Sequence, residues 1–270
     1  HIILIPEFFC RPAFIVSKIL GVKYSIYSAG TYSSVILEKK GNFARHSFSY
    51  AQNIFPMSEY TKKRILKFTN NKRITIVKSG YNDKKFFRIN CKKEKYSIIF
   101  VGNLKKRKGF RILAESILNL PISLRKKIFI RLVGHFKEGE FKDFKNKFKK
   151  NNIKYKIYSD ISEKQLCLLF NKSAVNVLPS ISEDYFYEGF GIVHYEAVAS
   201  NCLTIGSLDS GNECAIENHN GYLINQGRSS IDELNKILLK IFNSDEIAIP
   251  KGTPPLKWKE VTEKIISKII

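Results

Sequence analysis

Residues 179–197 combine glycines, carboxylates and a helix start in a spacing that could bind an anion. An apolar run, Val175–Leu178, leads into a polar loop in which Gly189 and Gly191 flank Phe190, and a helical pattern begins near Gly191. The unpaired N–H groups at a helix start, together with the positive end of the helix dipole, bind phosphate. The alternative is that both glycines only permit a turn. We predict that the backbone of Gly189, Phe190, Gly191 and Ile192 binds a phosphate group.

Two carboxylates lie on either side of this helix start. Glu188 comes just before the predicted helix, and Glu196 lies inside it, about one turn in. A carboxylate only accepts hydrogen bonds, which suits paired hydroxyl donors, and dinucleotide-binding folds hold ribose in this way. We therefore expect Glu188 to bind a sugar hydroxyl and Glu196 to bind the vicinal ribose hydroxyls. The alternatives are that Glu188 complements the helix dipole and that Glu196 is an exposed helix residue.

A basic loop follows another apolar run. Ser97–Val101 leads into Gly102-Asn103-Leu104-Lys105-Lys106-Arg107-Lys108-Gly109, and a helical pattern comes next. The chain has no Asp-x-Asp motif, so no divalent-metal clamp is indicated, and we predict no metal ligands. We expect Lys108 and the helix dipole to stabilise a departing nucleotide diphosphate instead. The alternative is that Lys108 is a solvated cation within a basic run.

Two further features allow a functional and a structural interpretation. His194 with Glu196 is superficially similar to a deaminase motif, but no Pro-Cys-x-x-Cys follows, so packing or a position at the rim is favoured over a metal or base role. Phe141, Phe144 and Phe148 could lie on a membrane, but their helical spacing favours a helix face that packs on a sheet.

The elements that must position these residues alternate between short apolar runs and amphipathic helical patterns. This alternation predicts parallel sheets with crossover helices, and strands that are apolar on both faces predict a sheet covered on both sides. The predicted strands are Ile2–Ile5, Tyr24–Tyr27, Asn53–Met57, Ile74–Val77, Ser97–Val101, Ile128–Val133, Lys154–Tyr158, Ala174–Leu178, Leu203–Ile205 and Gly221–Ile224. The predicted helices are 11–20, 43–51, 59–68, 109–119, 140–150, 162–171, 191–200, 230–243 and 257–269.

A polar segment divides this pattern into unequal parts. We predict a first Rossmann-like domain over residues 1–88, on the acceptor side, and a linker over 89–96. A nucleotide-sugar-binding domain should follow over 97–254, and a terminal helix over 255–270 should return to the first domain. A doubly wound domain has about six strands, whereas the first part has about four. Because the chain begins with His1 and its only methionine is Met57, we expect the first domain to lack its opening strands.

The composition excludes several classes of protein. The chain has 270 residues and is 44% hydrophobic, which is typical of a globular protein and not of a disordered one. The apolar runs are too short to span a membrane, and no signal peptide is evident. Five cysteines without a Cys-x-x-Cys pair argue against a disulfide framework and a thiolate zinc site, and favour a reducing compartment.

The net charge of +22 suggests an anionic partner. The positive residues are spread along the chain, however, and no nucleic-acid-binding motif accompanies them. The excess of Lys, Asn, Ile and Phe fits a coding bias toward A/T-rich codons. We therefore predict no nucleic-acid partner and keep an anionic membrane surface as a secondary partner.

Together the motifs resemble those of the family-4 retaining glycosyltransferases, which have the GT-B fold. Val101-Gly102-x-Leu104-x-x-x-Lys108-Gly109 is similar to the family's phosphate-binding Gly-Arg-Leu-x-x-x-Lys-Gly. Pro179-Ser180 followed by Glu188-Gly189-Phe190-Gly191 and Glu196-Ala197 is similar to its E-x7-E signature. The other similarities are Ser79-Gly80-Tyr81-Asn82 with Phe86 at the domain junction, Gly211-x-Glu213 and Asn220-Gly221 in the following loop, and Trp258 with Val261 in the terminal helix.

The resemblance implies an α/β, GT-B-like fold with two Rossmann-like parallel-sheet domains facing a cleft, the first incomplete. It implies transfer of a sugar from a nucleotide diphosphate sugar to a glycan, lipid or small-molecule acceptor, with retention of configuration and no cofactor. We expect this reaction in glycan or cell-envelope polysaccharide synthesis, in the cytoplasm or at the inner face of the membrane. Glu188 and Lys108 would be catalytic, and the donor would be bound by Gly102, Asn103, Lys108, Glu188, Gly189, Phe190, Gly191, Ile192 and Glu196.

Two positions differ from the family pattern. Asn103 stands where the phosphate motif has Arg, so Arg107 or Lys105 would have to supply that charge. Ala29, in the loop over residues 27–32, stands where the family usually has His before Gly. These differences keep a second hypothesis open, a non-catalytic or degenerate nucleotide-sugar-binding module. A basic nucleic-acid-binding protein is the third hypothesis.

Overall fold

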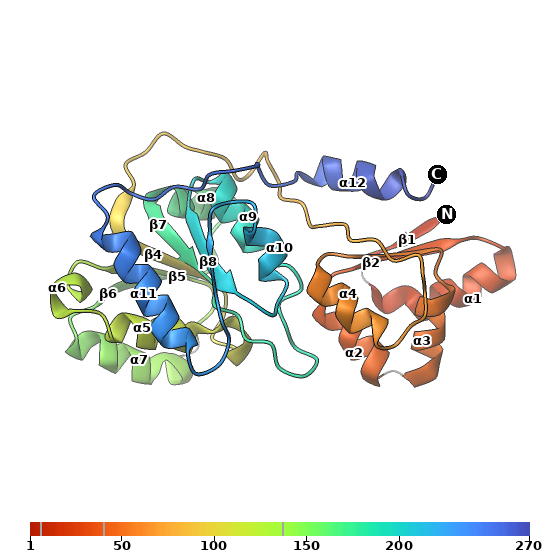
Figure 1. The fold of residues 1–270 in the computed structure, drawn as a ribbon, viewed down its shortest axis with the longest axis horizontal. Helices are drawn as coiled ribbons and strands as arrows, with labels where there is room; N and C mark the ends of the chain where they lie inside the picture. Colours follow the sequence, from red (N-terminus) through yellow and green to blue (C-terminus); the bar gives the residue numbers. More distant parts are fainter. Residues whose placement is uncertain (6, 40, 137) are drawn as a thin grey trace.

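Two parallel β-sheets, one small and one large, organise the chain (Figure 1). The computed structural model describes residues 1–5, 7–39, 41–136 and 138–270. The small sheet comes first and has the order β1-β2-β3, with parallel pairing throughout. Its strands are β1 (Ile2–Leu4), β2 (Tyr24–Ser28) and β3 (Asn53–Pro56). The short helix η1 (Glu7–Phe9) and the helices α1 (Cys10–Leu20), α2 (Thr31–Lys39), α3 (Gly41–Tyr50) and α4 (Glu59–Leu66) connect and follow them.

The second sheet has six parallel strands in the order β6-β5-β4-β7-β8-β9. They are β4 (Glu94–Val101), β5 (Phe129–Val133), β6 (Lys154–Tyr158), β7 (Ser173–Val177), β8 (Leu203–Ser207) and β9 (Tyr222–Ile224). The chain builds outward from β4 to β6 and then returns to the other side of β4 with β7. Ligands of open α/β sheets bind at such a switch point, outside the carboxyl ends of the strands. The prediction of parallel sheets and of six strands in this half is confirmed.

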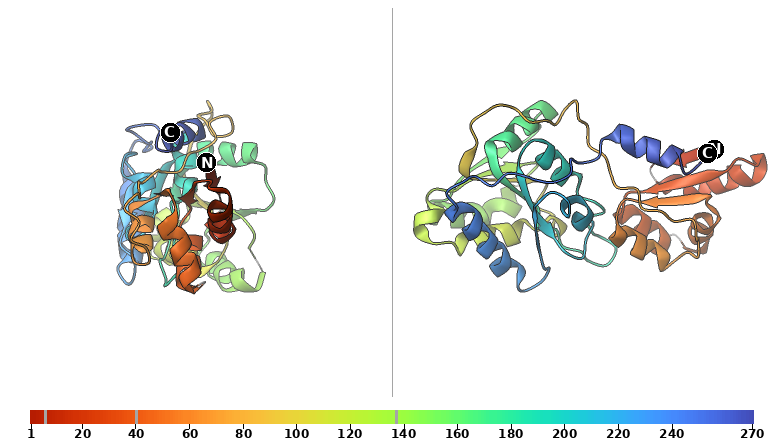
Figure 2. Two further views of the ribbon diagram at one scale, coloured as in Figure 1. Left: turned by 90° about the vertical axis from the view of Figure 1, so that its right-hand side faces the viewer. Right: turned by 45° about the horizontal axis from the view of Figure 1, so that its top comes forward.

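Helices cover both faces of the second sheet (Figure 2). They are η2 (Lys106–Lys108), α5 (Phe110–Leu118), α6 (Ile122–Arg125), α7 (Glu138–Lys150), α8 (Glu163–Lys172), α9 (Ile192–Ala199), α10 (Asn212–Ile216) and α11 (Ser230–Asn243). On α7, Phe141 and Phe148 are buried, and the Phe141 ring lies 5.3 Å from that of Tyr155 in β6. The phenylalanine stripe therefore packs inside the domain, as its spacing favoured.

One predicted strand is wrong. Ile74–Val77 forms only an isolated bridge, between Ile74 and Ile54 of β3. The N–H of Val77 donates to the carbonyl of Pro56 at 3.0 Å, but the bond that would complete a second bridge needs an N–H on Pro56. Proline has none, so the ladder stops.

Helix α2 was absent from the sequence prediction. Its first residues include Thr31, Ser33 and Ser34, which have weak helix propensity because they are β-branched or compete for backbone hydrogen bonds. Ser33, Ser34, Ile36 and Leu37 are buried in the structure. Tertiary packing therefore decides this helix, and α2 begins directly after the loop that faces the second domain.

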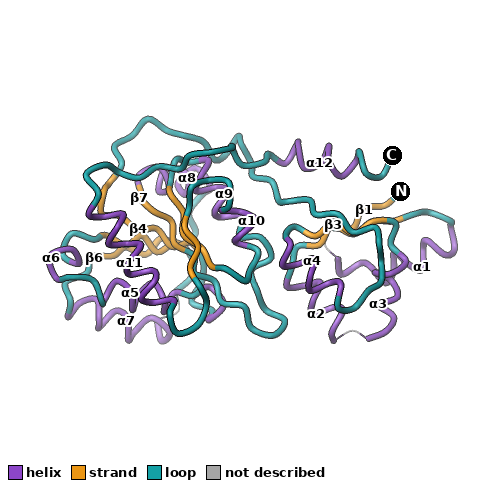
Figure 3. Tube along the Cα trace, in the orientation of Figure 1, coloured by secondary structure: helices purple, strands orange, loops and turns teal. Residues whose placement is uncertain are grey.

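The chain crosses between the sheets twice. A long loop runs from the end of α4 to β4 (Figure 3), and a second segment leads from α11 to α12 (Trp258–Ile266) beside the first sheet. Val261 and Ile265 of α12 are buried against Tyr27, Phe55 and Val77. The two crossings are bonded to each other, because the N–H of Tyr81 donates to the Leu256 carbonyl at 2.9 Å and the N–H of Trp258 to the Tyr81 carbonyl at 3.3 Å.

None of the helices in the described part of the chain is long and apolar enough to cross a membrane. All five cysteines are free thiols, and Cys202 and Cys214 are buried in the core. Both therefore act as small core residues.

Candidate functional site

The two loops singled out in the sequence meet at the switch point of the second sheet. One follows β4 and the other follows β7, its neighbour in the sheet. The N–H of Ile181 donates to the Arg107 carbonyl at 2.8 Å. Gly109 has φ +68, and a Cβ on it would lie 1.8 Å from the carbonyl oxygen of Pro179. Only glycine permits this close approach, which brings Lys108 beside Glu188.

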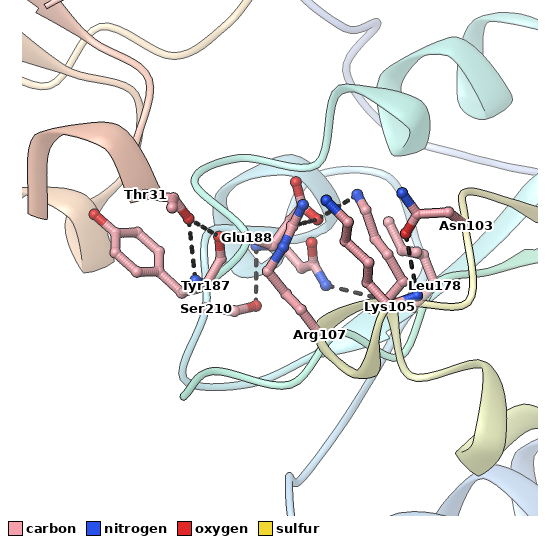
Figure 4. Close-up of polar contacts among 10 residues, drawn as sticks. Thr31, Asn103, Lys105, Arg107, Leu178, Tyr187, Glu188 and Ser210 are labelled. Carbon is pink, nitrogen blue, oxygen red and sulfur yellow. Dashed lines mark hydrogen bonds and ion pairs between the residues drawn. The ribbon is translucent and has the colours of Figure 1, made fainter. Parts of the chain in front are cut away.

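Arg107 and Glu188 (Figure 4) form a shielded charge cluster with Lys108. One carboxylate oxygen of Glu188, Oε2, accepts a bond from Lys108 Nζ at 2.7 Å and another from Arg107 Nη1 at 2.9 Å. The side chains are 14%, 18% and 27% exposed for Glu188, Lys108 and Arg107. Burial acts to raise the pKa of Glu188, but the two cations outweigh it and lower the pKa below its usual value. The cluster holds two cations against one anion, so it carries a net positive charge.

The loop before α9 presents free backbone N–H groups. In the described part of the chain, the N–H groups of Gly189, Phe190 and Gly191 donate to no other group. Gly191 has φ +79 and directly precedes α9. Phe190 is buried, and its ring lies 4.9 Å from that of Tyr195, so this contact fixes the turn. The side chain of Ile192, the first residue of α9, is exposed. Free N–H groups at the positive end of a helix make a site for an anion.

Gly102 and Asn103 contribute to the shape of the basic loop. The N–H of Gly102 donates to the Val133 carbonyl at 2.9 Å, so it is used within the fold. The side-chain oxygen of Asn103 accepts from the N–H of Lys105 at 3.2 Å and closes a local turn. Asn103 thus supports the loop, and Arg107 supplies the second cation beside Lys108.

In the part of the chain that the structure describes, Glu196 forms no ion pair or hydrogen bond with this cluster. It is two residues beyond His194 on α9, so the two side chains point to nearly opposite sides of the helix. Burial, together with the nearby carboxylate of Glu163 on α8, raises the pKa of Glu196 to about 7. The structure therefore brings Lys108, Glu188 and residues 189–191 together, and it places Glu196 on another side of α9.

The first domain contacts the same loop through the turn after β2. Gly30 has φ +118, and a Cβ on it would lie 2.4 Å from Gly189 Cα. Beneath this turn, Glu7 is fully buried and its Oε1 accepts from the N–H of Ala29 at 2.9 Å and from Ser33 Oγ at 2.6 Å. Sequence reasoning missed Glu7, and the only available signal was an acidic residue next to an apolar run.

His194 is fully buried behind the turn at Gly191. Asn176 Nδ2 donates to Thr204 Oγ1 at 3.0 Å, so the Thr204 hydroxyl is free to donate to His194 Nδ1, and the ring proton is assigned to Nε2. A Cβ on Gly191 would lie 2.5 Å from Asn212 Oδ1 and 3.3 Å from His194 Nε2. His194 therefore supports the loop from inside, in agreement with a packing role and not with a position at the rim.

The buried imidazole makes stability depend on pH. Burial lowers the pKa of His194 to about 4, although Glu188 and Asn212 favour its protonated form. The unfolded chain takes up this proton near its usual pKa, so we expect the free energy of unfolding to fall by about 2 kcal/mol between about pH 6.5 and pH 5. Denaturant unfolding of the natural protein and of His194→Gln measures this, and the variant should lose less stability over that range. Equal losses in both proteins would contradict the prediction.

The described residues contain no group of three or more His, Cys, Asp or Glu side chains that could hold a metal ion. The cations of Lys108 and Arg107 contact Glu188, the residue directly before the loop at 189–191.

Comparison with models of protein families assigns the chain to a family. A model of the family "Glycosyl transferases group 1" matches residues 82–249, which is more than half of the chain and includes both loops of the site. The chain belongs to this family.

This group 1 glycosyl transferase has a relative in Methanocaldococcus jannaschii, the uncharacterized glycosyltransferase MJ1069. The two are 24% identical over 212 residues, which cover 74% of this chain and 52% of the relative. The chain thus spans about half the length of the curated relative it matches.

Solved structures share the fold of this group 1 glycosyl transferase. Anabaena Alr3699/HepE, solved in complex with UDP and glucose, superposes with a TM-score of 0.77 at 14% identity, covering 99% of this chain and 77% of that one. Sucrose-phosphate synthase from Thermosynechococcus elongatus gives 0.76 at 16% identity, covering 97% and 71%. The predicted α/β, GT-B-like fold is confirmed.

Proposed function

We propose that the chain is a family-4, retaining glycosyltransferase that moves a sugar from a nucleotide diphosphate sugar to an acceptor. The observation that carries this proposal is that Lys108 and Arg107 contact Glu188, which directly precedes the free N–H groups at residues 189–191. Both lie at the switch point of the second sheet, where this kind of fold binds its ligands. A diphosphate is the ligand whose charge and oxygen atoms match this arrangement.

The donor would be divided among three groups of residues. The N–H groups at Gly189–Gly191 and the cations of Lys108 and Arg107 would hold the diphosphate and stabilise its charge as it leaves. The carboxylate of Glu188 would accept hydrogen bonds from the sugar, and Glu196 would accept bonds from the ribose. In this arrangement the two loops contact the donor at the phosphate end of the bond that breaks, and they stabilise the charge that develops there.

We propose that transfer needs neither a metal ion nor a cofactor. The chain lacks an Asp-x-Asp motif, and the positive charge that a metal would supply is available from Lys108 and Arg107. The nucleotide sugar would be a substrate. Added Mg²⁺ and added chelator should therefore leave turnover unchanged.

Calorimetry with UDP, GDP and ADP, followed by transfer assays with the corresponding sugars, tests the proposal. We use UDP as the first probe because Alr3699/HepE was solved with UDP and glucose. The expected result is saturable binding of a nucleotide and release of the same nucleotide on turnover, with the anomeric configuration of the donor retained in the product. Binding without turnover would favour a non-catalytic nucleotide-sugar-binding module. Absence of binding by all three nucleotides would exclude the proposal.

Glu196 makes a further prediction about pH. Its pKa is raised to about 7, so it is mostly protonated at pH 6 and ionised at pH 8. Only the ionised carboxylate accepts from both ribose hydroxyls, so UDP affinity should rise by up to about tenfold between about pH 6 and pH 8. UDP titrates as well, and Glu196→Gln therefore serves as the reference: its affinity should show only the part of the pH dependence that comes from UDP. Identical pH profiles for both proteins would remove Glu196 from the ribose site.

The acceptor, the polysaccharide pathway, the cytoplasmic location and the contact with an anionic membrane stay predictions from the sequence. The exposed lysines supply charge for such a surface, and binding to anionic vesicles that weakens with salt would support it.

A further inference from the structure

Tyr187, the residue directly before Glu188, belongs to the second domain but is packed into the first. Its side chain is 1% exposed. The ring lies 5.0 Å from that of Tyr60 in α4, and the Arg64 guanidinium lies 5.6 Å from the ring centre. The hydroxyl of Ser34 in α2 donates to the Tyr187 oxygen at 3.3 Å. The side chain is therefore held on three sides by α2 and α4.

One threonine of the first domain holds the backbone of Tyr187 (Figure 4). Thr31 Oγ1 donates to the Tyr187 carbonyl at 2.6 Å and accepts from the Tyr187 N–H at 3.1 Å. Thr31, the first residue of α2, thus forms hydrogen bonds with both the N–H and the carbonyl of Tyr187. This double contact fixes the orientation of the backbone as well as its position.

The residue after Glu188 is also bound to the first domain. The Gly189 carbonyl accepts from Ser58 Oγ at 2.7 Å and from Thr61 Oγ1 at 3.3 Å. Ser58 is the N-cap of α4 and is fully buried. The loop is therefore anchored to the first domain on both sides of Glu188.

Glu188 itself is bound to the second domain. Its carboxylate contacts Arg107 and Lys108, and its carbonyl accepts from the N–H of Gly211 at 2.7 Å. Tyr187 and Gly189 are thus bound to the first domain, and Glu188 between them is bound to the second. A change in the packing of Tyr187 would therefore move Glu188 with respect to Lys108.

We propose that Tyr187 is a positioning residue of the transfer reaction, which through Thr31 sets the place of the Glu188 carboxylate opposite the sugar. This inference rests on the proposed function. The groups assigned to the diphosphate are Lys108, Arg107 and the N–H groups at 189–191, and all of them are in the second domain. Loss of the Tyr187 anchor should therefore impair transfer more than it impairs binding of a nucleotide without a sugar.

The test compares Tyr187→Ala with Phe186→Ala, which removes the neighbouring aromatic ring of the same loop at a site that is 51% exposed. UDP affinity is measured by calorimetry, and kcat and KM are measured with the sugar nucleotide that the natural protein uses. For Tyr187→Ala we expect kcat to fall about 100-fold, because small displacements of a reacting group have effects of this size. We expect UDP affinity not to fall by more than about threefold, because a displaced Glu188 carboxylate competes less with phosphate. Phe186→Ala should leave kcat and UDP affinity unchanged.

Two milder variants separate positioning from loss of folding. Tyr187→Phe keeps the ring and loses one long hydrogen bond, so kcat should return to within about threefold of the natural value. Thr31→Val keeps the shape of Thr31 and removes its two bonds to the Tyr187 backbone, so kcat should fall about tenfold with unchanged UDP affinity. Near-ultraviolet circular dichroism shows whether each variant is folded.

The outcomes are distinguishable. If Tyr187→Ala and Thr31→Val both had the same kcat as the natural protein, the inference would be overturned, whereas the proposed function would stand. Equal losses of kcat and of UDP affinity in Thr31→Val would also overturn it, because the residue would then support the whole site. A natural protein that binds no nucleotide would instead show that the proposed function itself is wrong.

Discussion

Glu188→Gln is expected to bind UDP about tenfold more tightly than the natural protein, while its rate of sugar transfer falls at least about 100-fold. In the structure the Glu188 carboxylate forms ion pairs with Lys108 and Arg107, at 2.7 and 2.9 Å. A diphosphate must compete with this carboxylate for the same two cations. Glutamine keeps the shape of the side chain without its charge, so both cations become available to phosphate. The same change removes the acceptor that the proposal places at the sugar. Calorimetry and single-turnover transfer measure the two effects separately.

Glu183→Gln is the matched control for this change. Glu183 also pairs with a cation of the basic loop, Lys106, but both side chains are much more exposed than Glu188. Exposed pairs contribute little, so we expect no change in UDP affinity or turnover. Weaker UDP binding by Glu188→Gln would show that the carboxylate does not compete with phosphate.

Lys108→Ala is expected to lower kcat by about 100- to 1000-fold and to weaken UDP binding. Its ammonium group contacts Glu188, the residue directly before the free N–H groups at 189–191, and the proposal places the leaving diphosphate there. The low exposure of Lys108 limits screening by water and salt, so the lost interaction is large. Steady-state kinetics with the sugar nucleotide and calorimetry with UDP measure the effect.

Two substitutions in the same loop serve as references for Lys108→Ala. Lys105→Ala removes the same charge from an exposed position, and its turnover should be unchanged. The turnover of Arg107→Ala should lie between that of Lys108→Ala and that of Lys105→Ala, because Arg107 contacts Glu188 but is more exposed than Lys108. If all three variants lost activity equally, the net charge of the loop would matter and the placement of Lys108 would not.

The sequence predicted the second sheet well because its strands are short apolar runs between clear helical patterns. It also predicted a phosphate-binding role for both loops, and the two loops do meet, since the carboxyl ends of parallel strands lie at one edge of a sheet. Ile74–Val77 failed because its pairing depends on whether the opposite residue has an N–H, and that residue is Pro56. Helix α2 was missed because its stability comes from burial and not from its residue types.

The parts of the site that sequence reasoning missed depend on packing between elements that are distant in the chain. Spacing within the E-x7-E motif does not reveal that the carboxylate of Glu163 acts on Glu196, because that effect depends on how α8 packs against α9. Thr31 and Tyr187 are 156 residues apart in the chain and carry no pattern of their own. Only the packing of one domain on the other pairs them.

The double crossing between the sheets has a mechanical consequence. A single flexible linker would leave the second domain free to rotate about three axes. Here two segments run between the domains and are bonded to each other where Tyr81 meets Leu256 and Trp258, and a Cβ on Gly80 would lie 2.7 Å from the Trp258 backbone. Two segments joined at this isolated bridge constrain the relative motion of the domains more than a single linker would, which helps to keep Tyr187 in its place against α2 and α4.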